Sequence, residues 1–479
     1  MQNLSRAAHS QQSFFLRVYH SESTLAASDI LPYVAHTPEV RAQMLKTIGV
    51  KAIDDLFVDV PAHLRCESTG LPPPQSEIEV ERNMKTMAAL NLDASKAPFF
   101  CGAGCYRHKV PAAVDHTMQR SEWLTAYTPY QPEVSQGTLQ ALFEYETQVS
   151  RLLGTDFSNA SMYDGSTACT EAILMALRLS GKKKNVLVSG GLHPHYKDTA
   201  RTYLRMSHYG NMVEAARDVT GTENLISQLD ANTAAVVVQN PTVFGHPPSD
   251  MAPLAKACKK NGTLLIGVVT EPVSLGMIKS PGEMGCDIVV GEGQSLAGPM
   301  SFGGPHLGLF GCKAKFLRQM PGRLVGQTRD SEGKRVFVLT LGTREQHIRR
   351  EKATSNICTS SGVMATSFSM HLSMLGEVGL QGLARHNHAQ AVALAKAVKQ
   401  VDGVKMLNKS FFNEFTVGLP GGVSAAKVVE KMAKRGVLGG VPASRLFGKP
   451  DDNLLIMAAT EMNTPADNKA LCAALRASL

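Results

Sequence analysis

Short apolar runs alternate with stretches of helical periodicity from about residue 100 onward. The runs are rich in valine, isoleucine and leucine, and they are of strand length. They cover residues 186–188, 235–238, 264–266 and 288–290. Between them, segments such as 171–179 and 251–260 carry apolar residues at the spacing of a helix face. Strand and helix in alternation predict a largely parallel sheet with helices on both faces.

The two ends of the chain follow other patterns. Thr37, Pro38 and Glu39 combine a capping hydroxyl, a first-turn proline and an early acid, which predicts a helix start. Prolines at 72–74 then break the chain, so we expect a helical N-terminal arm at 29–99. After Ser360 the pattern is helical to about Lys399 and then mixes helix with short strand. We therefore expect a large α/β domain at 100–354 and a smaller α+β domain at 355–479.

Residues 1–28 differ in composition from the rest of the chain. They contain Arg6 and Arg17, several serines and glutamines, and no acid before Glu22. This composition is typical of a mitochondrial transit peptide, which would place the protein in the mitochondrial matrix. The alternative interpretation is a flexible tail on a protein of the bacterial cytoplasm.

The composition is that of an ordinary globular protein, with 479 residues of which 43% are hydrophobic and 19% charged. No apolar run approaches the roughly 20 residues that cross a bilayer, so no membrane span is expected. Nine cysteines at irregular intervals form neither a disulfide framework nor a zinc pattern, and we interpret them as reduced thiols. The histidine pairs lack a further ligand at metal spacing, so no metal site is expected. These pairs are His193 with His195, and His386 with His388.

The formal net charge is +8, with basic clusters at 182–184 and 344–352. This charge favours an acidic partner or substrate, although a solvated basic surface is the simpler explanation. No zinc-finger spacing or basic-aromatic motif accompanies it, so a nucleic-acid partner is not expected.

Candidate chemistry lies where helices begin and strands end. Gly165, Ser166 and Thr167 precede an apolar helix, and amides at a helix N-terminus can hold a phosphate, although the same residues are common caps. Glu271 follows an apolar strand, where an acid can pair with the protonated ring nitrogen of a cofactor or remain a loop carboxylate. The loop GEGQSLAGPMSFGGP at 291–305 follows another strand but contains no lysine, cysteine or histidine.

The phosphate-type turn, the strand-end acid and the glycine-rich loop occur in that order along the chain. This order resembles pyridoxal-phosphate (PLP) enzymes of the aspartate aminotransferase fold type, fold type I, in which such a loop carries the Schiff-base lysine. The resemblance implies an α/β PLP-dependent transferase fold with a large domain and a smaller α+β C-terminal domain.

Longer motifs make the resemblance more specific. They are CGAGCYRHKVP (101–111), TAYTPYQPEVSQGTLQALFEYET (125–147), NASMYDGSTACTEA (159–172), the loop at 291–305, and REQHIRREKATSNICT (344–359). Together they resemble glycine decarboxylase, the P-protein of the glycine cleavage system, and a looser resemblance covers about residues 30–479. The length is similar to that of the N-terminal half of the fused enzyme, which corresponds to the alpha subunit, or subunit 1, of the split form.

The resemblance implies that the glycine-rich loop has lost its covalent chemistry. In the catalytic partner half, a His-Lys-Thr segment precedes the proline and glycines of the loop. Aligned on those shared residues, Gly293 takes the place of the histidine and Gln294 that of the lysine. An amide cannot form a Schiff base, so PLP would be bound covalently by the partner subunit and not by this chain. The vestigial pocket positions would be Gly165, Ser166, Thr167, Glu271, Gly293 and Gln294, and nearby Lys279, Lys313 and Lys315 are expected at the surface.

The family's active site lies between the two kinds of half, and both halves are required. The segment 127–133 is a candidate contribution, because prolines fix its path and polar groups project from it. The alternative is a structural lead into the helix that ends at Gly154. A histidine near an apolar run is also often just hydrogen-bonded structure. The candidate interface residues are Tyr106, His108, Tyr127, Thr128, Tyr130, Gln131 and Glu133, and those for partner docking are Arg344, Arg349 and Arg350.

The implied reaction is decarboxylation of glycine at PLP and transfer of the aminomethyl group to the lipoyl arm of H-protein. The implied partners are a lysine-bearing subunit 2, in an α2β2 heterotetramer, and H-protein, which is typically acidic and therefore suits a basic surface. Two alternatives stay open. One is a structural or regulatory pseudoenzyme that only stabilises its partner, and the other is an independent PLP enzyme that uses another lysine.

Overall fold

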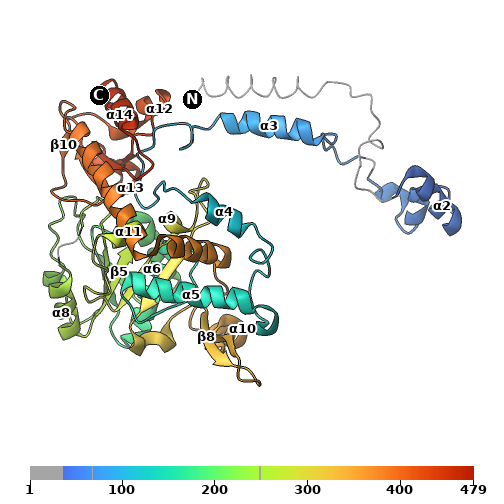
Figure 1. The fold of residues 1–479 in the computed structure, drawn as a ribbon, viewed down its shortest axis with the longest axis horizontal. Coiled ribbons are helices and arrows are strands. Elements are labelled where there is room, and N and C mark those ends of the chain that lie inside the picture. The colour runs from blue at the N-terminus through green and yellow to red at the C-terminus, as the bar shows by residue number, and fades with distance from the viewer. Residues whose placement is uncertain (1–35, 67, 248–249) are drawn as a thin grey trace. The chain divides into compact units, whose positions relative to one another are not determined.

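The computed structural model describes residues 36–66, 68–247 and 250–479. The chain divides into two compact units, Met1–Asn91 and Leu92–Leu479, and each is described by itself. Figure 1 labels some of their helices and strands.

The described part of the first unit is helical. Its elements are α2 (Pro38–Ile48), the 3-10 turns η2 (Ile53–Phe57) and η3 (Ala62–Leu64), and α3 (Glu77–Ala89). The hydroxyl of Thr37 accepts a hydrogen bond from the amide of Val40 (3.4 Å), which confirms the predicted helix start. Ser76 and Glu79 form a capping box at the start of α3. None of the residues in these helices is buried, so the described part of this unit has no core of its own.

A seven-stranded sheet stands at the centre of the second unit. Its strands are β1 (Phe157–Ser158), β2 (Asn185–Val188), β3 (Asn211–Glu214), β4 (Thr233–Gln239), β5 (Leu264–Val269), β6 (Ile288–Glu292) and β7 (Gly308–Cys312). The order is β1-β7-β6-β5-β4-β2-β3, and strands β2 to β6 run parallel, whereas β7 is antiparallel to both of its neighbours. Each of the predicted apolar runs lies in β2, β4, β5 or β6, so the largely parallel sheet is confirmed.

Helices cover both faces of this sheet. They include α5 (Gln136–Leu153), α6 (Gly165–Leu179), α7 (Pro194–Ser207), α8 (Ala252–Asn261) and α11 (Gly362–Val398). Alternate strand residues point to opposite faces. Val236 and Val238 accordingly join a core cluster with residues of α5 and α11, whereas Val237 joins a second cluster with residues of α6 and α7. Helices α5 and α11 lie side by side over one face (Figure 1).

Helix α11 connects the large sheet to a second core. Ala365 and Phe368, near its start, pack in the sheet core, whereas Leu394 and Val398 pack in a cluster with the C-terminal elements. Gly376 interrupts the helix with a non-helical backbone (φ 57°). The long helix predicted between Ser360 and about Lys399 is confirmed.

The C-terminal elements form an antiparallel sheet backed by helices. The strands are β10 (Lys405–Met406), β11 (Glu414–Gly418), β12 (Val441–Pro442) and β13 (Leu454–Ala458), in the order β10-β11-β13-β12. The helices are α12 (Ala425–Lys434), α13 (Ala443–Phe447), η10 (Lys449–Asp451) and α14 (Pro465–Arg476). The predicted domain boundaries at 99/100 and 354/355 stay predictions.

Shorter elements connect these layers. They are α4 (Ala112–Met118), η4 (Pro132–Val134), η5 (Ile226–Gln228), η6 (Pro272–Gly276), α9 (Gln294–Ala297), η7 (Ala314–Gln319), the hairpin β8 (Leu324–Arg329) and β9 (Arg335–Thr340), η8 (Gly342–Arg344), α10 (Gln346–Arg349) and η9 (Arg350–Lys352). None of the described helices is both long and apolar enough to cross a membrane. The transit-peptide hypothesis concerns residues 1–28, which lie outside the described residues.

Candidate functional site

The N-terminus of α6 is the predicted phosphate-binding turn. Asp164 caps this helix and accepts hydrogen bonds from the Thr167 amide (2.9 Å) and the Ser166 hydroxyl (2.6 Å). The amide of Gly165 donates to Oε2 of Glu292 (3.0 Å). The three predicted residues therefore do gather at a helix N-terminus, but the anion that the amide of Gly165 meets is a carboxylate of this chain.

Glu292 ends β6, and its side chain is only 7% exposed. Its Oε1 also accepts hydrogen bonds from the amides of Gln294 (3.0 Å) and Leu307 (2.9 Å). A β-carbon added to Gly165 would lie 3.0 Å from Cβ of Glu292 and 2.1 Å from the hydroxyl oxygen of Tyr196. The backbone at Gly165 is therefore closely packed against Glu292 and Tyr196. Glu292 was not predicted, because no local pattern separates it from the other polar residues of the loop.

Glu271, the predicted strand-end acid, is buried at the end of β5 and is also engaged. Its Oε1 accepts a hydrogen bond from the amide of Val273 (3.1 Å), and its Oε2 accepts one from Nδ2 of Asn413 (3.0 Å). Oε2 lies 2.8 Å from Nε2 of His108, whose Nδ1 lies 2.9 Å from Oε2 of Glu461. The ring that faces Glu271 is thus an imidazole of this chain. Asn413 and Glu461 were not predicted.

The charges of this group stabilise one another. Burial by itself would lower the pKa of His108, but the carboxylates of Glu271 and Glu461 raise it to about 10. Burial by itself would raise the pKa of Glu461, but the hydrogen bond and charge of His108 lower it to about 2. His108 is therefore an imidazolium, paired on both ring nitrogens, at neutral pH.

Gln294, in the position that resembles that of the Schiff-base lysine, begins α9 and is 2% exposed. Its Nε2 donates a hydrogen bond to the carbonyl of Gly298 (2.7 Å), and the thiol of Cys105 lies 3.7 Å from its Oε1. A β-carbon on Gly293 would lie 2.9 Å from a methyl carbon of Leu307. A side chain added at Gly293 would therefore press on the buried Leu307.

The segment 101–108 fills the space between these groups. The hydroxyl of Tyr106 donates to Oε2 of Glu414 (2.9 Å), and burial raises the pKa of Glu414 to about 7. The carbonyl of Ala103 lies 2.9 Å from Nε2 of His193. Tyr106 is 3% exposed and the side chain of His108 is 2% exposed. The interface role expected for these two residues stays a prediction, and within this chain their polar groups are bonded to carboxylates.

The described pocket residues do not fit a covalently bound PLP. The helix end that would hold a phosphate binds Glu292, the acid that would face a ring nitrogen binds His108, and an amide stands at the lysine position. Nearby Lys313 is held by Asp287 (3.0 Å), while Lys279 is exposed. No step of chemistry is therefore assigned to a cofactor on this chain.

The segment 127–133 lies at the surface, as the interface hypothesis requires. Tyr127 is 76% exposed and Tyr130 is 58% exposed. Thr128 is half-buried, and its hydroxyl lies 3.0 Å from that of Thr359. Gln131 and Glu133 are exposed on either side of the first residue of η4. The structure thus gives this segment a fixed path and a polar, accessible surface.

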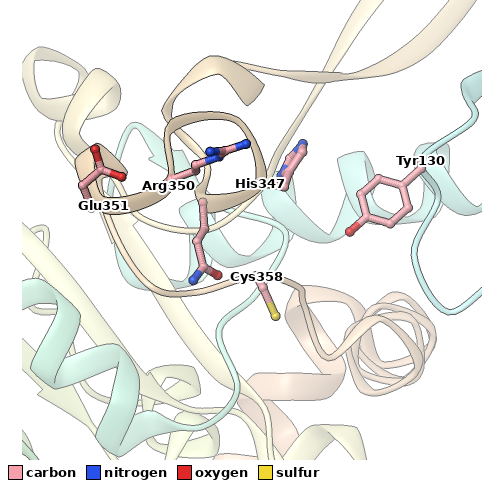
Figure 2. Close-up of a pocket in the computed structure, with 6 residues that line it drawn as sticks. Tyr130, His347, Arg350, Glu351 and Cys358 are labelled. Atoms are coloured by element: carbon pink, nitrogen blue, oxygen red, sulfur yellow. The ribbon is translucent and has the colours of Figure 1, made fainter.

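Tyr130 forms one wall of a cavity of about 460 Å³. Figure 2 shows the residues that line it, which come from the tyrosine segment and from 346–358. They are Tyr130, Gln346, His347, Arg350, Glu351 and Cys358. Tyr163 bonds to one of these lining residues, since its hydroxyl accepts a hydrogen bond from the amide of Cys358 (3.1 Å).

The three arginines expected to dock a partner have different surroundings. Arg349 and Arg350 are exposed, and Arg350 lines the cavity. Arg344 is half-buried, and burial lowers its pKa. Its Nε and Nη2 have no hydrogen-bond acceptor within the described residues. Only Arg349 and Arg350 present a guanidinium at the surface.

The remaining candidates have structural partners. His193 bonds to Ala103, and Nδ1 of His388 lies 2.8 Å from the carbonyl of Phe412. Within the described ranges, no group of three or more histidines, cysteines, aspartates or glutamates could hold a metal ion.

The fold is that of a class of proteins, the PLP-dependent enzymes of fold type I. A cysteine desulfurase from Escherichia coli (13% identity, TM-score 0.59, 82% of this chain and 98% of that chain) shares the fold. A sphingosine-1-phosphate lyase from Burkholderia pseudomallei does so as well (13% identity, TM-score 0.60, 87% of this chain and 93% of that chain). At this level of identity they show the fold alone.

The chain belongs to the glycine cleavage system P-protein family, whose model matches residues 32–475. A probable glycine dehydrogenase (decarboxylating) subunit 1 from Methylocella silvestris is 55% identical over 93% of this chain and 99% of its own length. The corresponding protein of Beijerinckia indica is 55% identical over 92% and 98%. An inhibitor-bound glycine decarboxylase (P-protein) is similar in structure, with 42% identity and a TM-score of 0.83 over 94% of this chain and 100% of that chain.

Proposed function

We propose that this chain is the alpha subunit of a split glycine decarboxylase and that it forms no Schiff base itself. With a lysine-bearing subunit 2 it decarboxylates glycine and passes the aminomethyl group to the lipoyl arm of H-protein. The observation that carries the proposal is Gln294, which is 2% exposed and whose amide is bonded to Gly298 (2.7 Å) at the position where the family's catalytic half has a lysine. PLP is then held by the partner subunit, where it supplies the electron sink for the decarboxylation.

This chain contributes a surface to the shared active site and to the docking of a partner. The exposed tyrosine segment supports a role at the shared active site, because Tyr127, Gln131 and Glu133 present polar groups outward and the backbone beside them is fixed by proline. Arg349 and Arg350 support docking of an acidic partner, because both guanidinium groups are exposed. We propose an α2β2 assembly and lipoylated H-protein as the acidic partner. We also propose the bacterial cytoplasm as the location, because the relatives are from bacteria.

The test is co-expression with the lysine-bearing subunit, followed by an assay of exchange between bicarbonate and the carboxyl group of glycine. We expect exchange only when both subunits are present. After borohydride reduction of the complex, peptide mapping should find the pyridoxyl adduct on the partner alone. A stoichiometric adduct on a lysine of this chain would overturn the proposal and favour the independent PLP enzyme.

The pseudoenzyme alternative has a separate outcome. If this chain only stabilised its partner, substitutions in the segment 127–133 would change neither kcat nor KM of the assembled enzyme. The proposal instead requires a kinetic loss without loss of assembly.

A further inference from the structure

Arg323 lies beneath Tyr130 and binds it in two ways. Its Nη2 donates a hydrogen bond to the phenol oxygen (2.9 Å), and its guanidinium carbon lies 5.0 Å from the centre of the ring. The side chain of Arg323 is 3% exposed, whereas Tyr130 is 58% exposed. A buried cation is thus fixed to a phenol that lines the cavity shown in Figure 2.

The rest of the Arg323 guanidinium is poorly satisfied. Its Nε lies 3.5 Å from Oε2 of Glu345, which is also buried, but without hydrogen-bond geometry. Within the described residues, Nε and Nη1 have no hydrogen-bond acceptor. Buried charged donors without acceptors destabilise a fold, so this arginine is not explained by stability. Buried charged groups that are kept although they destabilise the fold are common at functional sites.

Glu345 connects this arginine to the opposite wall of the cavity. Its Oε2 also lies 3.7 Å from Nδ1 of His347. The ring of His347 meets that of Tyr130 edge-on, with centroids 6.1 Å apart. The four side chains therefore form a closed ring, in which Arg323 and Glu345 are buried and Tyr130 and His347 face the cavity.

The backbone around Arg323 does not need the guanidinium to hold it in place. The carbonyl of Arg323 accepts a hydrogen bond from the amide of Ala160 (2.8 Å). The amide of Val325 donates to Oε1 of Glu146 (2.8 Å). These bonds already fix the start of β8 without the side chain of Arg323, which instead binds Tyr130.

We propose that Arg323 is a positioning residue for the shared active site, and that it acts through the hydroxyl of Tyr130. The inference rests on the proposed function, because it takes Tyr130 to be one of the residues that this chain presents to its partner's substrate. Arg323 is too deeply buried to touch the substrate. Its guanidinium fixes the direction of the phenol, and its positive charge makes the phenol O–H a better hydrogen-bond donor.

The experiment is a double-mutant cycle in the enzyme assembled with its lysine-bearing subunit. The variants are Tyr130→Phe, Arg323→Lys, Arg323→Met and the Tyr130→Phe/Arg323→Met double variant. We expect Tyr130→Phe and Arg323→Met each to lower kcat/KM for glycine by about 10- to 100-fold. The double variant should be no slower than the slower single variant, because both changes remove the same interaction.

A conservative variant and a matched control separate this role from general damage. Arg323→Lys keeps the charge and a donor, so it should recover part of the loss and also permit the cycle if Arg323→Met does not fold. Arg335→Met is the control, because Arg335 also lies over an aromatic ring (Phe337, 5.4 Å) but is exposed on β9. It should leave kcat/KM unchanged.

The outcomes distinguish the inference from the proposed function. If the losses at positions 130 and 323 multiply in the double variant, Arg323 does not act through Tyr130 and only the inference is overturned. If Tyr130→Phe alone leaves kcat and KM unchanged in a fully assembled enzyme, the place of Tyr130 in the shared site is wrong, and the inference is overturned with it.

Discussion

Nε2 of His108 lies 2.8 Å from Oε2 of Glu271, and both side chains are almost completely buried. The pair joins the segment before α4 to the end of β5, and Glu461, beyond β13, extends it to the C-terminal elements. An acid that resembles the cofactor-binding acid of fold type I is therefore neutralised by an internal cation. The pocket is closed by charge pairing as well as by packing.

We predict that His108→Ala lowers the free energy of unfolding by about 3–5 kcal/mol, because it leaves Glu271 buried without its cation. The measurement is equilibrium unfolding by denaturant. The control is His116→Ala, because His116 is exposed on α4 and its removal should cost at most about 0.5 kcal/mol. Equal losses in the two variants would contradict a stabilising role for the His108–Glu271 pair.

The same pair predicts how stability depends on pH. Because the folded pKa of His108 is raised from about 6.5 to about 10, its stabilisation is fully present below pH 6.5 and is lost as the pH rises through 10. The folded pKa of Glu461 is lowered from 4.5 to about 2, so its contribution is present above pH 4.5 and is lost as the pH falls through 2. Denaturant midpoints across this range should therefore fall at both ends, and His108→Gln should flatten the alkaline side.

The sequence predicts which strand, acid and loop belong to this site better than it predicts the partners of their side chains. Strand β5, the acid Glu271 two residues after it and the Gln294 loop follow from periodicity and motif order, which are local properties. The partners of Glu271 do not, because His108 and Glu461 are far from it in the sequence and only the fold brings them together. The motif that contains Tyr106 and His108 likewise does not indicate their bonds to Glu414 and Glu461.

Packing at the start of α6 gives a third prediction. Gly165→Ala should destabilise the chain by about 1–3 kcal/mol, because the new methyl group would overlap the hydroxyl of Tyr196 and the side chain of Glu292. Gly137→Ala is the matched control. Gly137 lies in α5 with no atom within 4 Å of the added carbon, so alanine should stabilise the helix by up to about 1 kcal/mol. Thermal unfolding of both variants measures the difference, and a neutral Gly165→Ala would mean that this helix end has free space.

The exposed segment gives a fourth prediction. Tyr127→Phe and Gln131→Ala should lower turnover of the assembled enzyme more than they lower its thermal stability, because both residues are exposed in this chain. Gln228→Ala, at an exposed position of η5, should change neither quantity. Unchanged turnover in fully assembled Tyr127→Phe and Gln131→Ala enzymes would exclude these residues from the shared site.

The last prediction concerns Gln294→Lys, which restores the amine that a Schiff base requires. We expect no decarboxylation by this chain and no pyridoxyl adduct at position 294 after borohydride reduction. An amine alone is insufficient, because Glu292 occupies the helix end that would hold the phosphate and His108 occupies the acid that would face the ring. A side chain added at Gly293 would also press on the buried Leu307, because a β-carbon there would meet its methyl carbon at 2.9 Å. Mass spectrometry of the reduced chain measures the adduct, with the lysine-bearing subunit as the positive control. A stoichiometric adduct at position 294 would mean that Glu292 and His108 leave the pocket readily. The segment 101–108 would then not be what excludes the cofactor.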